Sequence, residues 1–206
     1  TVPVILGVID KSKRELAINS AYKYRDEINK SYASKIIDNN SYDLKDGEYD
    51  ISYYIDQGVQ VSGESPSGGW VLIEDDEVSD FSFKIGEYAV TYYSSTDTIE
   101  AIKNGEVALS PRALAMKNAT DKVSTYLAQV VSVVDTKNYD EDKSFTMGEV
   151  VTELSVAKTI GFDDNSWVYL DYDPNVSSNN VSVTKYSFKI TEGDYTFIIE
   201  RIFWIV

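Results

Sequence analysis

The sequence predicts an α+β protein in which a long N-terminal amphipathic helix packs on an antiparallel sheet, followed by a second helix-plus-sheet unit. Three observations predict this fold. Apolar residues recur at three- and four-residue steps in two long stretches, as they do on one face of a helix. Strand-like segments separated by turn residues follow each stretch. Short strings from the first half also recur, in the same order, in the second.

The first helix is expected over residues 3–37. Pro3 is tolerated near the start of a helix, and Asp38-Asn39-Asn40-Ser41 ends it because these residues favour caps and turns. Six residues form one apolar stripe that we expect to hold the first sheet on the helix. They are Ala17, Ala21, Tyr24, Ile28, Tyr32 and Ile36.

The segment around residues 49–55 permits two interpretations. Ile51, Tyr54 and Ile55 have helical spacing, whereas Tyr49, Ile51, Tyr53 and Ile55 alternate as in a strand. Strands are then expected over residues 70–74, 78–85 and 87–93. Asp75-Asp76 and Gly86 supply the turns of this antiparallel meander.

A second helix is expected over residues 110–135, because Ser110 is a good N-cap and Pro111 suits the first helical position. Its stripe is Ala119, Val123, Leu127, Val130 and Val134. A short helical segment at Met147, Val150, Val151 and Leu154 follows. Strands are expected over residues 167–172, 181–190 and 194–204.

The recurring strings predict a duplication. Trp70-Val71 recurs as Trp167-Val168, and Ser82-Phe83-Lys84-Ile85 recurs as Ser187-Phe188-Lys189-Ile190. Ordered repeats whose spacing grows by small insertions indicate tandem copies of one unit, and chance resemblance between two β-rich halves is the alternative. We expect units at residues 1–108 and 109–206, joined near 104–109.

Composition narrows the chemistry. The formal net charge of −15 disfavours nucleic acid and anionic membrane surfaces as partners, since both would repel the chain. Without cysteine or histidine, the chain cannot form a disulfide, a thiol nucleophile or a histidine-based triad. Acidic clusters such as Asp75-Asp76-Glu77 resemble solvated turns more than paired catalytic carboxylates. We expect no enzymatic activity and no resident cofactor.

Two weaker patterns concern binding. Asp171, Asp173 and Asn175 offer the alternating oxygen ligands with which a calcium loop begins, but the glycine and distal glutamate of an EF-hand are missing. A plain Asp-Pro-Asn turn is the competing interpretation. Several tyrosines could form an adhesive patch for glycans or proteins, although strand alternation would turn about half of them inward. They are Tyr53, Tyr54, Tyr92, Tyr93, Tyr169 and Tyr172.

The N-terminal segment joins an apolar run to a basic cluster. Pro3, Ile5, Leu6 and Ile9 precede Lys11, Lys13 and Arg14, as at the end of a membrane-embedded helix that emerges into water. A plain solvated helix face is the competing interpretation of the basic cluster, and within a fibre the same face would contact acidic neighbours. The apolar run is shorter than the roughly 20 residues that span a bilayer, so we expect any membrane segment upstream of Thr1.

Together with the glycine-rich approach to a strand at residues 58–71 and the Gly86-Glu87-Tyr88 turn, this start resembles the type IV pilins of clostridial-type Gram-positive bacteria. The duplication resembles minor pilins with a dual pilin fold. The resemblance implies a structural, non-enzymatic subunit of an extracellular pilus, anchored in the cytoplasmic membrane before assembly. Its partners would be other pilin subunits, with the second unit displayed for adhesion to surface glycans or proteins or for self-association. A secretion or DNA-uptake pseudopilin and a non-polymerising surface binding module are the alternatives.

Overall fold

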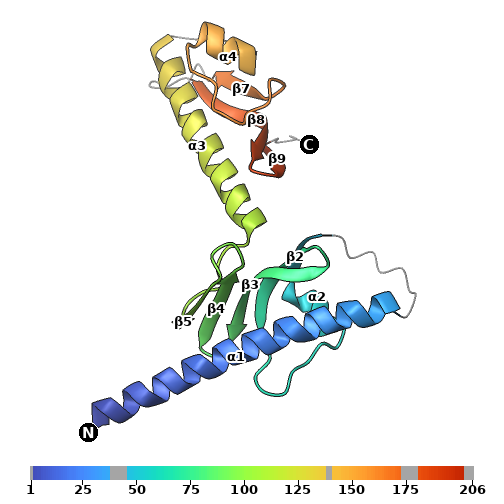
Figure 1. Ribbon diagram of the computed structural model, residues 1–206. Coiled ribbons are helices and arrows are strands. Elements are labelled where there is room, and N and C mark those ends of the chain that lie inside the picture. Colours follow the sequence, from blue (N-terminus) through green and yellow to red (C-terminus); the bar gives the residue numbers. More distant parts are fainter. Residues whose placement is uncertain (1, 38–45, 138–140, 173–180, 202–206) are drawn as a thin grey trace. The chain divides into compact units, whose positions relative to one another are not determined.

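The computed structural model describes residues 2–37, 46–137, 141–172 and 181–201 (Figure 1). The protein is α+β, with an N-terminal helix and two antiparallel sheets. The chain divides into two compact units, Thr1–Pro111 and Arg112–Val206, each with its own hydrophobic core.

The first unit is a long helix laid across a meander of strands. Helix α1 covers Val2–Ile37, and the five strands pair in chain order, each antiparallel to the next. Figure 1 shows α1 crossing one face of this sheet, where it contacts the third, fourth and fifth strands. The strands are β1 (Gly47–Asp50), β2 (Gly68–Glu74), β3 (Glu77–Ile85), β4 (Tyr88–Tyr93) and β5 (Thr98–Lys103).

The helix stripe enters the core of this unit. Ala17, Ala21, Tyr24, Ile28 and Tyr32 are all buried, and the side chain of Ile36 lies outside the described residues. The Tyr24 ring meets Phe83 of β3 edge-on at 5.7 Å between centroids, and Phe83 stacks on Phe81 at 4.6 Å. These aromatic rings fill the space between helix and sheet.

The ambiguous segment near residue 50 is strand followed by helix. The carboxylate of Asp50 accepts a hydrogen bond from the Ser52 amide at 2.8 Å and caps α2 (Ile51–Asp56). The helix buries Ile51 and Tyr54, whereas Tyr49 belongs to β1. The cap decides the outcome, because apolar spacing over so few residues fits both structures.

The second unit begins with α3 (Pro111–Lys137) and carries a four-stranded sheet in chain order. Its stripe differs at one position from the expected one: Tyr126 is buried, and Leu127 only partly. The Tyr126 ring packs edge-on against Phe162 and Phe188, which gives the larger aromatic side chain the inward position. The other elements are β6 (Lys143–Thr146), α4 (Met147–Glu153), β7 (Trp167–Tyr172), β8 (Val181–Glu192) and β9 (Tyr195–Arg201).

Two strands, β5 and β6, escaped prediction, and β1 was foreseen only through Tyr49 in the strand alternative for residues 49–55. β1, β5 and β6 are short, with four to six residues, and local alternation is a weak signal at that length. The strand expected over residues 194–204 is described as β9 up to Arg201. Of these strands, β5 matters most for the site described next.

Candidate functional site: the junction between the first helix and its sheet

Helix α1 has two parts with different surroundings. From Ala17 onward its stripe is buried against the sheet, whereas Val8 and Ile9 are 61% and 47% exposed. In Figure 1 these N-terminal turns extend beyond the strands of the first sheet. The exposure of these two aliphatic side chains distinguishes this part of α1 from the part that packs on the sheet.

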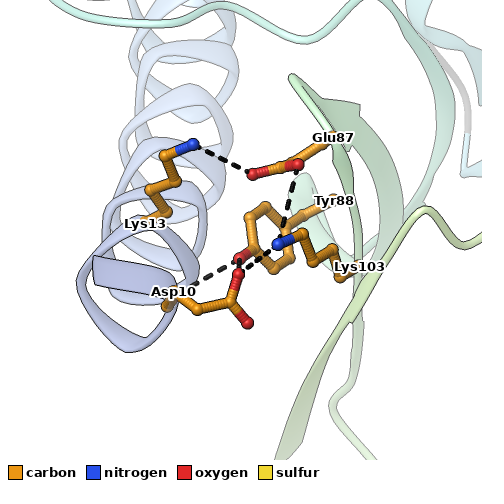
Figure 2. A network of polar contacts seen from close by, with 5 residues as sticks. All are labelled: Asp10, Lys13, Glu87, Tyr88 and Lys103. Carbon is orange, nitrogen blue, oxygen red and sulfur yellow. Dashed lines mark hydrogen bonds and ion pairs between the residues drawn. The ribbon is translucent and has the colours of Figure 1, made fainter. Parts of the chain in front are cut away.

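Five side chains meet where the helix leaves the sheet, and we call them the junction cluster (Figure 2). The Tyr88 hydroxyl donates to the backbone carbonyl and to Oδ1 of Asp10, both at 3.1 Å. Lys103 forms an ion pair with the same Asp10 oxygen. Lys13 reaches Oε1 of Glu87 at 3.4 Å, and Lys103 approaches Oε2 of Glu87 at 3.9 Å.

Strand register brings the sheet members of this cluster together. Tyr88 begins β4, Lys103 ends β5, and the two residues are direct cross-strand partners. Glu87 lies in the tight turn before β4, next to Gly86, whose φ of +54° favours glycine. A Cβ at Gly86 would also lie 2.7 Å from a carboxylate oxygen of Glu64. Because the end of the exposed Glu64 side chain can move, the positive φ is the main reason for glycine in the turn that presents Glu87 to the helix.

The cluster is electrically balanced, with two carboxylates and two ammonium groups around one phenol. The hydrogen bond from Lys103 lowers the pKa of Asp10, and in return the hydrogen bond to Asp10 raises the pKa of Lys103. Burial raises the pKa of the Tyr88 hydroxyl, and its bond to Asp10 adds to the rise. Asp10 therefore stays ionised, and Lys103 and Tyr88 stay protonated, across the neutral range.

The four charged side chains of the cluster are each at least one-third exposed. Exposed ion pairs stabilise proteins only weakly, because water screens them. Tyr88 is buried beneath them. We interpret the junction cluster as a set of directional contacts that determine where, and at what angle, α1 leaves the sheet.

A groove of about 920 Å³ lies beside the cluster, between α1, the loop after α2 and the β3–β4 turn. Leu16 on its wall is 65% exposed, and Ala17 and Ile85 give it further apolar lining. Within the described residues, Lys23 and Glu64, which also line it, have no ion-pair partner. The groove thus offers one free charge of each sign beside an apolar wall.

The apolar run and the basic cluster at the N-terminus both lie on α1. Pro3, Ile5 and Leu6 belong to the helix, but their side chains lie outside the described residues. Ile9 is exposed, as are the three basic residues. These contact their own unit: Lys11 pairs with Glu15 at 3.9 Å, Lys13 with Glu87, and the Arg14 Nε–H donates to the Ala101 carbonyl at 3.2 Å.

Of the three residues of the calcium-like pattern, the structure describes only one. Asp171 lies exposed on β7, and Asp173 and Asn175 fall outside the described residues. Nearby, Asp163 accepts hydrogen bonds from the backbone and side-chain nitrogens of Asn165, at 2.9 and 2.8 Å, which is an ordinary Asx turn. Across the described part of the chain, no group of three acidic side chains is placed to hold a metal ion.

The tyrosines proposed as an adhesive patch are not all on the surface. Tyr54 is buried on the inner face of α2 and is one of the tyrosines that face inward, as expected for part of the set. Tyr53 and Tyr93 are exposed, whereas Tyr92, Tyr169 and Tyr172 are half-buried. Tyr92 and Tyr169 donate hydrogen bonds to Asp97 and Asp142 respectively.

Sequence reasoning missed most of the junction cluster. Lys13 was the only member named as a candidate, because Asp10, Glu87, Tyr88 and Lys103 come from segments far apart in the chain. The available signal was the pairing of β4 with β5, which places Lys103 beside Tyr88. That pairing was invisible while β5 was unrecognised.

Among the helices in the described residues, none is long and apolar enough to cross a membrane. Comparison with known proteins found no family model, no curated protein and no solved structure that matches this chain.

Proposed function

We propose that this protein is a structural subunit of an extracellular type IV pilus, a minor pilin that carries two helix-plus-sheet units. The observation that carries the proposal is the divided character of α1. A single helix of 36 residues, about 54 Å long, packs on a sheet over its C-terminal part and exposes Val8 and Ile9 on its N-terminal part. Such a helix can join one subunit to others while its sheet stays folded beside it.

The junction cluster supports a mechanical role. A subunit held in a fibre by one end of a helix transmits force through the point where the helix meets the sheet. Asp10 and Lys13 connect that point of α1 to Tyr88, Lys103 and Glu87 by hydrogen bonds and ion pairs. Such contacts resist rotation of the helix about its axis, because they depend on direction and distance.

Support for duplication comes from matching element order. A strand leads into a short capped helix in both units, with Asp50 capping α2 and Thr146 capping α4. In each sheet a tryptophan also stands opposite a serine of the next strand, Trp70 opposite Ser82 and Trp167 opposite Ser187. Two copies on one subunit would leave the second unit available for display or self-association.

The test follows the native protein in fibres sheared from its host cells. We expect the chain in the sheared fraction, with a processed N-terminus and matching intact mass. Val8→Asp and Ile9→Asp should lower incorporation about tenfold or more, since burying an unpaired carboxylate in a contact is costly. Ile160→Asp is the matched control, because Ile160 is 89% exposed but lies in the second unit.

Two results would overturn the proposal. One is absence from the sheared fraction together with an unprocessed or lipidated start in the membrane fraction, which would favour a non-polymerising surface module. The other is equal incorporation of the Val8, Ile9 and Ile160 variants, which would show that the N-terminal turns of α1 take no part in assembly.

A further inference from the structure

In the first unit, the outer face of the sheet, opposite α1, is covered by the segment that follows β5. Three of the polar contacts of this segment, residues 104–109, join it to side chains of that face. The Trp70 indole N–H donates to the Ala108 carbonyl at 2.7 Å, and the Lys84 ammonium donates to the Gly105 carbonyl at 2.7 Å. The Ala108 amide donates to the Ser82 hydroxyl at 3.0 Å.

The side chains that hold the segment form a compact set fixed by strand register. Trp70 stands opposite Ser82, and Ser82 stands opposite Thr91, whose hydroxyl it meets at 2.7 Å. Lys84 follows on the same face of β3, opposite Ala89. With the segment in place, Trp70 is 6% exposed, Ala89 is 3% exposed and Ser82 is fully buried.

The second sheet presents a tryptophan, a serine and a lysine in the same register, whereas Glu200 and Ile198 stand where the first sheet has Thr91 and Ala89. Trp167 stands opposite Ser187, Ser187 opposite Glu200, and Lys189 opposite Ile198. The Ser187 hydroxyl donates to Glu200 at 2.7 Å, just as Ser82 is held by its neighbour across the strands. Its oxygen can therefore still accept an amide N–H. We call Trp167, Ser187, Lys189, Ile198 and Glu200 the open face.

Within the described residues, no segment covers the open face as residues 104–109 cover its counterpart. Ile198 is 63% exposed, whereas Ala89 at the matching position is buried. Trp167 is half-buried, and within the described residues its indole N–H has no acceptor. In the same part of the chain, β9 has no strand on its outer side, whereas β4 has β5. The first sheet is thus completed by β5 and by residues 104–109. Neither has a counterpart in the described part of the second unit.

We propose that the open face, with the outer edge of β9, is a docking site for an extended segment of another polypeptide. The segment would add a strand to β9 and then cross the face, as β5 and residues 104–109 do in the first unit. Its chemistry follows from the groups that would receive it. Trp167 and Lys189 would donate to two backbone carbonyls three residues apart, as Trp70 and Lys84 do to those of Ala108 and Gly105. Ser187 would accept from a backbone amide, as Ser82 does from that of Ala108.

Charge limits the side chains of that segment. The carboxylate of Glu200 is engaged by Ser187, and Lys189 lies 3.5 Å from a carboxylate oxygen of Asp163. Lys189 is thus already paired, whereas the neutral Ser187 hydroxyl leaves the negative charge of Glu200 in place, so the face disfavours acidic side chains. The exposed Ile198 favours small and aliphatic side chains. The docking segment belongs to a different polypeptide and is not residues 104–109 of a second copy of this protein, because those residues already bind their own sheet. The inference stands whether or not the protein assembles into a pilus.

The test uses the full chain with ¹⁵N-labelled tryptophan and a synthetic peptide of residues 98–110, which joins the β5 strand to the covering segment. Phe substitutions assign the indole signals of Trp70, Trp167 and Trp204. We expect saturable peptide binding that shifts the Trp167 indole signal and leaves that of Trp70 unchanged. A scrambled peptide should produce no such shift.

Matched variants locate the contact. Lys189→Ala and Ser187→Ala should each weaken peptide binding by about three- to tenfold, the size of one lost hydrogen bond. Lys185→Ala should not, although Lys185 is on the same face of β8, because its ammonium lies over the Tyr169 ring, 4.7 Å from the centroid. Amide spectra of each variant establish that it is folded.

Four outcomes would overturn the proposal. The first is a Trp167 signal that does not move at about 1 mM peptide, the concentration that half-saturates a site with a binding free energy of about −4 kcal/mol. The second is an equal shift of that signal with the scrambled peptide. A Trp167 indole protected from solvent exchange in the dilute free protein would mean that this chain covers its own face. A Trp167 shift that grows with protein concentration in the absence of peptide would assign the face to a second copy.

Discussion

Asp10 is the residue on which the junction cluster depends most. It accepts hydrogen bonds from Tyr88 and is ion-paired with Lys103, so one carboxylate joins the helix to two strands. Tyr88 also donates to the Asp10 backbone carbonyl, a bond that a change of side chain leaves in place. Replacing the side chain therefore tests the charged part of the cluster by itself.

We expect Asp10→Asn to reduce amide protection of α1 around residues 10–14 at neutral pH. The pKa of Asp10 is lowered by Lys103, so its contribution is complete above the ordinary carboxyl pKa of about 4 and is lost as the pH falls through the folded pKa. Hydrogen exchange measured by NMR on both proteins at matched pH values should show a difference that disappears in acid.

The matched control is Asp26→Asn. Asp26 is a similarly exposed carboxylate further along α1, paired at 2.7 Å with its neighbour Arg25. It should leave protection around residues 10–14 unchanged. A difference between wild type and Asp10→Asn that persists below the folded pKa would contradict an electrostatic role for Asp10.

At the scale of the element, α1 is held by close packing of small and large residues on one face. Ala21 is fully buried between helix and sheet, whereas Ala33 on the same helix is exposed. The small side chain at position 21 lets the helix backbone approach the strands, and Tyr24 and Ile28 then fill the space beside it.

We expect Ala21→Leu to destabilise the first unit by about 1–3 kcal/mol, because extra methyl groups in a filled core force side chains off their rotamers. Ala33→Leu should change the free energy of unfolding by less than about 0.5 kcal/mol, as exposed substitutions do. Urea unfolding followed by fluorescence measures both. Equal stabilities for the two variants would mean that the helix is not packed against the sheet at Ala21.

At the scale of the whole molecule, the two hydrophobic cores share no residue. Phe83 anchors the first and Phe188 the second, and both are fully buried. Each core joins a long helix to its own sheet, so each unit has the parts of an independently folding domain.

We expect Phe83→Ala and Phe188→Ala each to destabilise its own unit by about 3–5 kcal/mol, as truncation of a buried aromatic ring does. Hydrogen exchange followed by mass spectrometry should show lost protection in residues 10–103 for the first variant and in residues 111–201 for the second. Loss of protection in both units from either single substitution would refute independent folding.

Much of the fold could be predicted from the sequence, because the signals were local. Apolar residues at helical spacing located α1 and α3, and Ser110-Pro111 marked the start of α3. Turn residues at Asp75-Asp76 and Gly86 separated β2, β3 and β4. Each of these signals lies in the same short segment of sequence as the helix or turn that it predicts.

The candidate sites could not be predicted in the same way. Tyr88 and Lys103 become neighbours only through the register of β4 and β5, and Asp10 joins them from a helix about 80 residues away in the chain. Trp70 is buried because residues 104–109 cross it, whereas the similar Trp167 remains half-open.

The sequence by itself therefore determined the two long helices, the hairpins and most of the inward-facing residues, because periodicity is a local property of the chain. Only the tertiary structure decided which charged residues meet at the base of α1 and which sheet face is left uncovered. Both depend on contacts between segments far apart in sequence, and a pattern confined to one segment carries no information about such contacts.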